Sequence, residues 1–115
     1  CGPFHQGIAT PRTAQALMRS RYSAYVVKND AYLLATWHKT TRPPQIDFSQ
    51  DHTHWIKLDI VKTKKGGVND SSGVVEFNAF YQQDDNDKVE RLHEISRFKK
   101  VEGRWFYVDG ELMST

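Results

Sequence analysis

The side chains best suited to chemistry lie in residues 91–110 (RLHEISRFKKVEGRWFYVDG), where ionisable and apolar residues are interleaved. His93, Glu94 and Asp109 are the candidates in this stretch for proton transfer in general acid–base catalysis. A buried charge without a partner is costly, so Glu94 or Arg97 must be paired or solvated inside a fold. The stretch therefore predicts a partly polar cavity. The alternative is that Glu94 and Arg97 form a structural ion pair or lie at the solvated rim, and both interpretations remain open.

Two strands joined by a tight turn at Val101 to Gly103 are predicted to position these groups. Successive side chains of a strand point to opposite faces. Because His93 and Glu94 are adjacent, they cannot easily act together as a catalytic dyad. One predicted face carries Leu92, Glu94, Ser96 and Phe98, and the other carries His93, Ile95, Arg97 and Lys99.

Aromatic residues in both halves of the chain are candidates for the walls of a binding pocket, since small-molecule sites are mostly apolar with a few placed polar groups. Aromatic residues at helix or strand spacing also fit an ordinary core, and His38 also fits a helix end cap. The residues predicted to bind a ligand are Arg21, Tyr22, Tyr25, Trp37, His38, Glu94, Arg97, Trp105 and Tyr107, with Tyr81 as a further wall and His93 and Asp109 as further polar groups.

Helices are predicted in the first part of the chain. Apolar residues spaced three and four apart predict a helix over 13–27, with Thr10 or Thr13 as its cap. Asn29 and Asp30 are predicted to cap a second helix over 31–38, which ends before the consecutive prolines of the next loop. A short helical turn is predicted over 47–54.

Strands are predicted from Trp55 onward. Ile56, Leu58 and Ile60 alternate with polar residues, as in a half-buried strand, and residues 75–81 repeat this pattern. With the hairpin described above, the order is two helices followed by four antiparallel strands. This order predicts an α+β fold in which the N-terminal helices pack on one face of a curved four-stranded sheet.

Composition sets limits on partners and location. The 115 residues carry a net charge of +2, with +4 in residues 1–50 and −2 in residues 51–115, which permits an anionic partner near the first helix. Cys1 is the sole cysteine, so no internal disulfide forms. No apolar run approaches 18 residues, so we expect no membrane span and a cytoplasmic location.

Six segments together resemble the YchJ-type (UPF0225) proteins associated with the SEC-C zinc motif: CGPFHQG, LMRSRYSAYV, YLLATWH followed by TRP, VEFNAFY, LHEISRF and RWFYVDG. The resemblance implies a middle domain of NTF2-like, cone-shaped fold over residues 10–115. It also implies that residues 1–9 are the remnant of an N-terminal SEC-C zinc motif and linker, in which Cys1 matches the last zinc-binding cysteine. A zinc site needs about four ligands, so we expect zinc in the flanking motif of the full-length protein and no cofactor in this domain.

The preferred hypothesis for function is non-enzymatic binding. The cone or the helical face would bind a protein partner or a small ligand, and the SEC-C resemblance links such binding to protein translocation or chaperone systems. One alternative is an enzyme of hydrolase or isomerase type that uses His93, Glu94 or Asp109 in the cone. A second is association with the ribosome or nucleic acid, and a homodimer through the sheet is also open.

Overall fold

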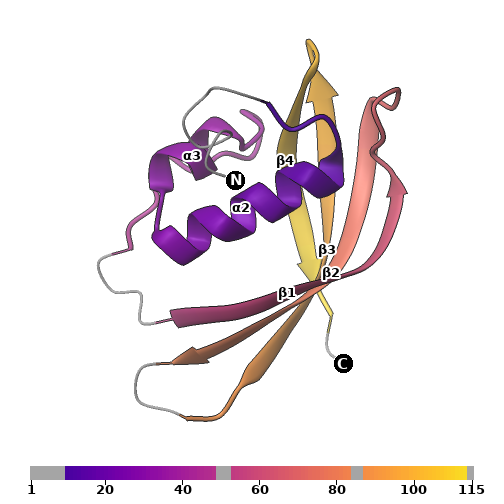
Figure 1. Cartoon of the computed structure of the whole chain (residues 1–115). Coiled ribbons are helices and arrows are strands. Elements are labelled where there is room, and N and C mark those ends of the chain that lie inside the picture. Colours follow the sequence, from indigo (N-terminus) through magenta and orange to yellow (C-terminus); the bar gives the residue numbers. More distant parts are fainter. Residues whose placement is uncertain (1–9, 49–52, 84–86, 114–115) are drawn as a thin grey trace.

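Two helices are followed by four antiparallel strands, and the computed structural model describes residues 10–48, 53–83 and 87–113. The sheet order follows the chain, β1-β2-β3-β4, and both helices lie on one face of the sheet (Figure 1). The predicted α+β architecture is confirmed. The elements are α2 (Ala14–Val27), α3 (Asp30–Ala35), β1 (Thr53–Lys65), β2 (Ser72–Gln83), β3 (Glu90–Val101) and β4 (Arg104–Leu112).

Helix α2 begins and ends as the sequence predicts. The side chain of Thr13 caps it by accepting a hydrogen bond from the backbone N–H of Ala16 at 3.0 Å. Lys28, with φ of 57°, ends it in a left-handed conformation. The buried face is wider than the predicted apolar stripe, because α3 covers a second side of α2. This wider face includes the buried residues Ala14, Leu17, Met18, Ser20, Arg21 and Ala24.

Helix α3 is shorter than predicted. Asn29 caps it by accepting a hydrogen bond from the N–H of Tyr32 at 3.2 Å, but the helix ends at Ala35 rather than at His38. The chain then follows the edge of β4, where the N–H of His38 donates to the carbonyl of Tyr107 at 2.7 Å and the N–H of Tyr107 donates to that of Thr36 at 2.8 Å. The unpaired backbone groups of an edge strand explain why this segment leaves the helical path.

Strand β1 departs from the simple alternation that the sequence predicts. Its register with β2 shifts at two places, between Trp55 and Lys57 and between Ile60 and Lys62. A bulge of this kind reverses the faces that follow it, so Trp55 joins Leu58 on the inner face and Ile56 is exposed. The prediction that Ile56 lies on the buried face is therefore wrong.

The helical turn predicted over 47–54 is not found where the structure describes this segment. Residues 47–48 have no regular structure, residues 49–52 lie outside the described residues, and residues 53–54 already belong to β1. The prediction is therefore wrong for the described residues.

The hairpin of β3 and β4 has the predicted turn and one unpredicted bulge. Glu102 and Gly103 form a two-residue connection with φ of 51° and 82°, the conformation that suits the twist of paired strands. Further along, Phe98 pairs with Tyr107 but Arg97 pairs with Asp109, so Val108 is extra in β4. The bulge places Asp109 on the outer face, away from the helices.

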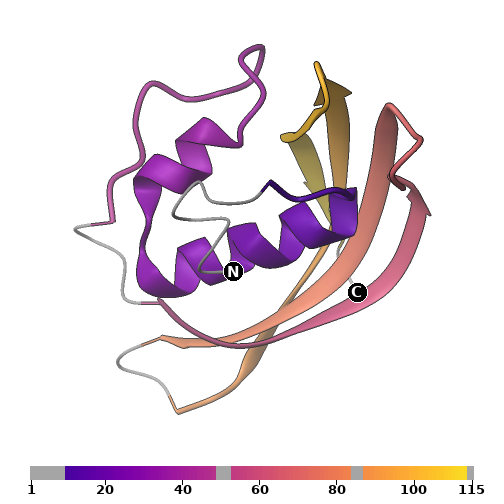
Figure 2. The same cartoon turned by 45° about the horizontal axis from the view of Figure 1, so that its top comes forward.

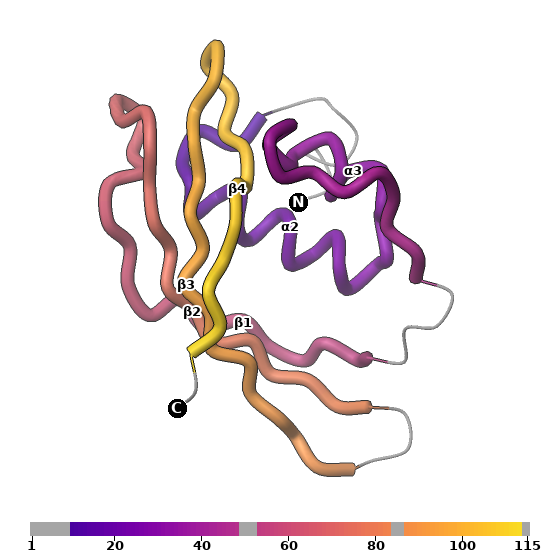
Figure 3. The backbone as a smooth tube through the Cα atoms, turned by 180° about the vertical axis from the view of Figure 1, so that it is seen from behind, coloured from indigo at the N-terminus to yellow at the C-terminus, as the bar shows by residue number. Residues whose placement is uncertain are grey.

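The sheet curls around α2, as the bent paths of its strands show (Figures 2 and 3). The main core lies between α2 and the inner face of the sheet. A smaller core of Ala24, Tyr32 and Leu33 joins the two helices. The buried members of the main core are Ala14, Leu17, Met18, Val75, Phe77, Ala79, Phe98 and Trp105.

Candidate functional site

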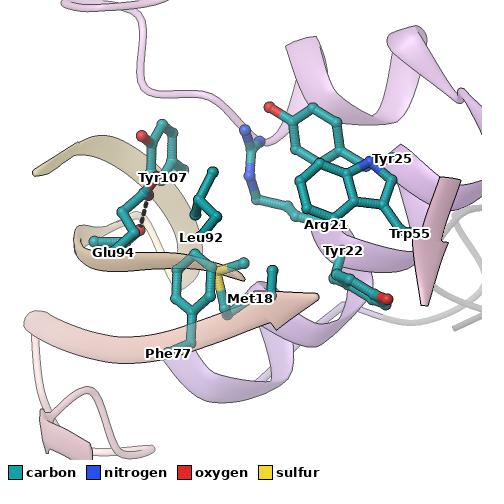
Figure 4. A pocket seen from close by; sticks show the side chains of 11 residues that line it. Met18, Arg21, Tyr22, Tyr25, Trp55, Phe77, Leu92, Glu94 and Tyr107 are labelled. Carbon is teal, nitrogen blue, oxygen red and sulfur yellow. Dashed lines mark hydrogen bonds between the residues drawn. The ribbon is translucent and has the colours of Figure 1, made fainter. Parts of the chain in front are cut away.

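A cavity of about 250 Å³ opens beside this core, between α2 and the concave face of the sheet (Figure 4). Four residues of its wall come from α2, three of them with polar tips, and three aromatic residues come from the strands. The cavity is thus mostly apolar with few polar groups, the usual make-up of a small-molecule site. It is lined by Met18, Arg21, Tyr22, Tyr25, Trp55, Phe77, Ala79, Leu92, Glu94, Ser96 and Tyr107.

Arg21 is the buried cation of this site, with 2% of its surface exposed. Its Nη1 donates to the carbonyl of Leu33 at 2.8 Å and to Oγ1 of Thr36 at 2.7 Å, which joins α2 to the end of α3. The guanidinium lies 5.1 Å from the ring centroid of Trp37 and 4.6 Å from that of Tyr107, within the range of cation–π attraction. Burial lowers the pKa of Arg21.

No carboxylate among the described residues forms a salt bridge with Arg21. Two hydrogen bonds and two aromatic rings offset part of the cost of burying the charge, but they supply no opposite charge. The site therefore holds a desolvated cation that an anion would stabilise further.

Glu94 borders the cavity from β3 and occupies space that Gly110 leaves open. A Cβ atom on Gly110 would lie 2.3 Å from Oε2 of Glu94 and 3.0 Å from the phenol oxygen of Tyr107. The absence of a side chain at position 110 is thus what allows Glu94 to sit beside Tyr107. Ser96, which is fully buried, donates a hydrogen bond to the same carboxylate oxygen.

Tyr107 lies between the two charges of the site. Burial, and then the negative charge of Glu94, raises the pKa of Tyr107 to about 12. At neutral pH the side chain is therefore a protonated phenol, which can donate a hydrogen bond.

The structure brings together part of the predicted ligand-binding set. Arg21, Tyr22, Tyr25, Glu94 and Tyr107 all line the cavity. Trp55 also lines it and was missed, because the β1 bulge that turns it inward leaves no mark in the alternation of the sequence.

The other predicted aromatic residues do not line this cavity. Trp37 lies against the Arg21 guanidinium. Trp105 is buried in the core and its Nε1 donates to the carbonyl of Arg12 at 3.1 Å. Tyr81 packs beside Trp55, with ring centroids 5.4 Å apart.

Four predicted polar residues lie elsewhere. His93 pairs with Glu76 at 2.6 Å on the outer face of the sheet. Arg97 pairs there with Asp109, also at 2.6 Å, so the alternative of an ion pair between Arg97 and Glu94 is wrong. Glu94 alone among the three proton-transfer candidates borders the cavity.

His38 lies beside β4 rather than in the cavity. Its Nδ1 is 2.7 Å from Oγ1 of Thr40 and accepts a hydrogen bond from the N–H of the same residue. Its ring packs edge-on against Phe106. These contacts support the loop that follows α3.

Lysines gather on the outer face of the sheet near the end of β1. Lys64 pairs across the sheet with Val74, which pairs with Arg97, and these residues border a shallow hollow of about 400 Å³. The hollow therefore has a basic border of Lys64, Lys65, Arg97 and Lys99, with Asp109 as its acidic member.

The described residues contain no group of three or more His, Cys, Asp or Glu side chains placed to hold a metal ion. Cys1 and the rest of residues 1–9 lie outside the described residues. Within the described ranges, no helix is long and apolar enough to cross a membrane.

Comparison with known proteins identifies the family. Residues 13–110 match the family model described as YchJ, middle NTF2-like domain. The chain belongs to the YchJ family. It is 46% identical over 111 residues to a UPF0225 protein of Streptomyces avermitilis, covering 96% of this chain and 74% of that protein. It is 47% identical over 113 residues to a UPF0225 protein of Chromobacterium violaceum, covering 96% and 82%.

Solved structures support the same family and fold. The solution structure of a SEC-C motif containing protein from Rhodopseudomonas palustris matches with a TM-score of 0.85 and 29% identity, covering 99% of this chain and 89% of that one. The crystal structure of a SEC-C motif containing protein from Psychrobacter arcticus matches with a TM-score of 0.75 and 25% identity, covering 98% and 70%. The YchJ fold is thus a pair of helices on an open antiparallel sheet, as predicted.

Proposed function

We propose that this YchJ-family domain is a non-enzymatic binding module that holds a small organic molecule in the cavity between α2 and the sheet. The observation that supports the proposal is the buried Arg21, which borders an open apolar cavity and has no carboxylate partner among the described residues. A core built only for stability gains little from such a residue, because apolar side chains of similar volume often stabilise as well or better.

The placement of the ionisable residues favours binding over catalysis. General acid–base chemistry needs a proton-transfer group within reach of the substrate and a second group that completes the transfer. Glu94 borders the cavity, whereas His93 and Asp109 are paired on the opposite face of the sheet. This arrangement supports recognition of a ligand by fixed polar groups.

Filling the cavity tests the proposal. Ala79 is buried on the cavity floor in β2, so Ala79→Leu should occupy part of the volume and weaken binding of small aromatic fragments at least tenfold, or about 1.4 kcal/mol. Ligand-observed NMR with a mixed fragment set would measure this effect, after native mass spectrometry of the purified protein for retained molecules.

Val74→Leu is the matched control, because Val74 belongs to the same strand but borders the hollows on the outer face. Leu92→Phe, also on the cavity wall, provides a second filling variant if Ala79→Leu fails to fold. Equal fragment binding by the wild type and a folded filling variant would reject the cavity as the site. Failure of every fragment to bind the wild type, with no retained molecule, would reject the proposed function itself.

A further inference from the structure

We infer that the ligand of this cavity is a small aromatic carboxylate, whose anion pairs with Arg21 and whose far end donates a hydrogen bond to Glu94. The inference rests on the proposed binding function and names the chemical class that the cavity recognises.

The guanidinium of Arg21 keeps N–H groups that a carboxylate could use. Nη1 carries two protons, and both have acceptors, in the Leu33 carbonyl and the Thr36 hydroxyl. Three N–H groups remain, on Nε and Nη2; the side chain of Tyr25 makes a hydrogen bond with the guanidinium, and the other N–H groups can donate to a carboxylate. Tyr25 also lines the cavity, and it supplies a hydroxyl rather than a carboxylate, so Arg21 has no acidic salt-bridge partner among the described residues.

The surroundings of Arg21 strengthen its attraction for a bound anion. Trp37 and Tyr107 lie against the guanidinium, and burial separates it from bulk water. Attraction between opposite charges grows as the local dielectric constant falls. The direct attraction between a carboxylate and Arg21 would therefore be stronger than at a surface arginine.

Glu94, the other charged group of the cavity, favours a ligand that carries a hydrogen-bond donor. Glu94 reaches the cavity from β3, beside Tyr107, and its carboxylate receives a hydrogen bond from Ser96 (Figure 4). A carboxylate has about four acceptor positions, so further donors can be accommodated. A hydroxyl or amino group on the ligand would satisfy this end of the site, whereas a second carboxylate would be repelled.

The volume and lining of the cavity determine the size and type of ligand that fits. A cavity of about 150 Å³ can hold benzene, so about 250 Å³ admits one ring with two short substituents. Tyr22 and Trp55 form part of the wall with their rings edge-to-face at 6.1 Å, and Phe77 adds a third ring. Aromatic walls favour a flat aromatic body, because rings attract one another in offset and edge-to-face arrangements.

Matched pairs of acid and amide probes test the inference on the wild-type protein. The pairs are benzoate with benzamide and 4-hydroxybenzoate with 4-hydroxybenzamide, and the dissociation constants come from two-dimensional NMR titration. We expect each acid to bind at least tenfold more tightly than its amide, and 4-hydroxybenzoate to bind severalfold more tightly than benzoate. The shifted resonances should include those of Trp55 and Tyr107.

Two variants test which residue binds each end of the ligand. Arg21→Gln should reduce the preference for acid over amide to less than threefold, and Glu94→Gln should reduce the preference for the hydroxylated probe. Arg19→Gln is the matched control, because Arg19 is exposed on the same helix, and it should leave both preferences unchanged. If Arg21→Gln does not fold, the acid-to-amide ratio of the wild type still decides the main claim.

The outcomes separate this inference from the proposed function. Amides that bind as tightly as the acids, at the same cavity residues, would overturn the carboxylate assignment and leave small-molecule binding intact. If a folded Arg21→Gln protein keeps the preference for acid over amide, the role of Arg21 in binding the carboxylate would be overturned. Absence of any shift at cavity residues with every probe would overturn the inference, and the fragment screen described above would then decide the proposed function separately.

Discussion

Replacing Gly73 with alanine is expected to destabilise the domain by about 3 kcal/mol or more, at the upper end of the cost of overpacking a core. A Cβ at this position would lie 2.5 Å from Cα and 2.9 Å from N of Gly66, and 3.2 Å from Cβ of Ala14. The two closest atoms belong to backbone, which cannot move aside as a flexible side chain does. The surrounding contacts resist adjustment, because the N–H of Ala14 donates to the carbonyl of Gly66 at 2.9 Å.

Gly103→Ala is the matched control for this prediction. Gly103 has φ of 82° in the turn between β3 and β4, and a Cβ there would meet no atom within 4 Å. Its cost is then backbone strain alone, about 1 to 2 kcal/mol. Urea unfolding followed by tryptophan fluorescence measures both variants, and a Gly73→Ala protein as stable as Gly103→Ala would contradict the predicted clash.

The same contact links stability to the candidate site. Gly66 and Gly73 hold the first turn of α2 against the β1–β2 hairpin, and the later turns of α2 carry Arg21 and Tyr25 into the cavity. Loosening the first turn should therefore weaken ligand binding even where the variant remains folded.

The sequence was sufficient for the architecture because the signals involved are local. Helix spacing, caps and the turn at Glu102 and Gly103 each depend on a few neighbouring residues, and α2 begins and ends within a residue of the prediction. The family resemblance supplied the remaining step, from an order of elements to the NTF2-like arrangement that the comparisons confirm.

The site was harder to predict because bulges decide which residues face it. Strict alternation would put Asp109 on the same face as Tyr107, but the extra residue Val108 sends Asp109 outward and brings Gly110 inward beside Glu94. A similar shift brings Trp55 into the cavity wall. Such shifts depend on long-range strand pairing, which a single sequence does not reveal.

Arg21 shows a different limit. Its type marked it as a candidate, but its burial depends on α3 folding back over α2 and on the segment after α3 pairing with β4. The spacing of apolar residues in the predicted helix does not include Arg21. The contacts that desolvate it come from residues up to 86 positions away in the chain, such as Tyr107.

The second large effect that we expect is a loss of stability at alkaline pH through Tyr107. Its pKa is about 12 in the folded protein against an ordinary value of 10.0. Below pH 10 the phenol is protonated in both the folded and unfolded states, so its contribution is fully present. Between pH 10 and 12 the unfolded state ionises first, so the free energy of unfolding should fall by about 2 kcal/mol.

Tyr107→Phe isolates this contribution, because phenylalanine keeps a ring beside Arg21 and Phe98 but has no proton to lose. Urea unfolding at several pH values between 9 and 12 should show a shallower decline in stability for Tyr107→Phe than for the wild type. The comparison removes the effect of the other titrating groups, including Tyr22 and Tyr32, whose pKa values burial also raises. Parallel declines would show that Tyr107 ionises equally easily in both states, and would contradict the raised pKa of Tyr107 in the folded protein.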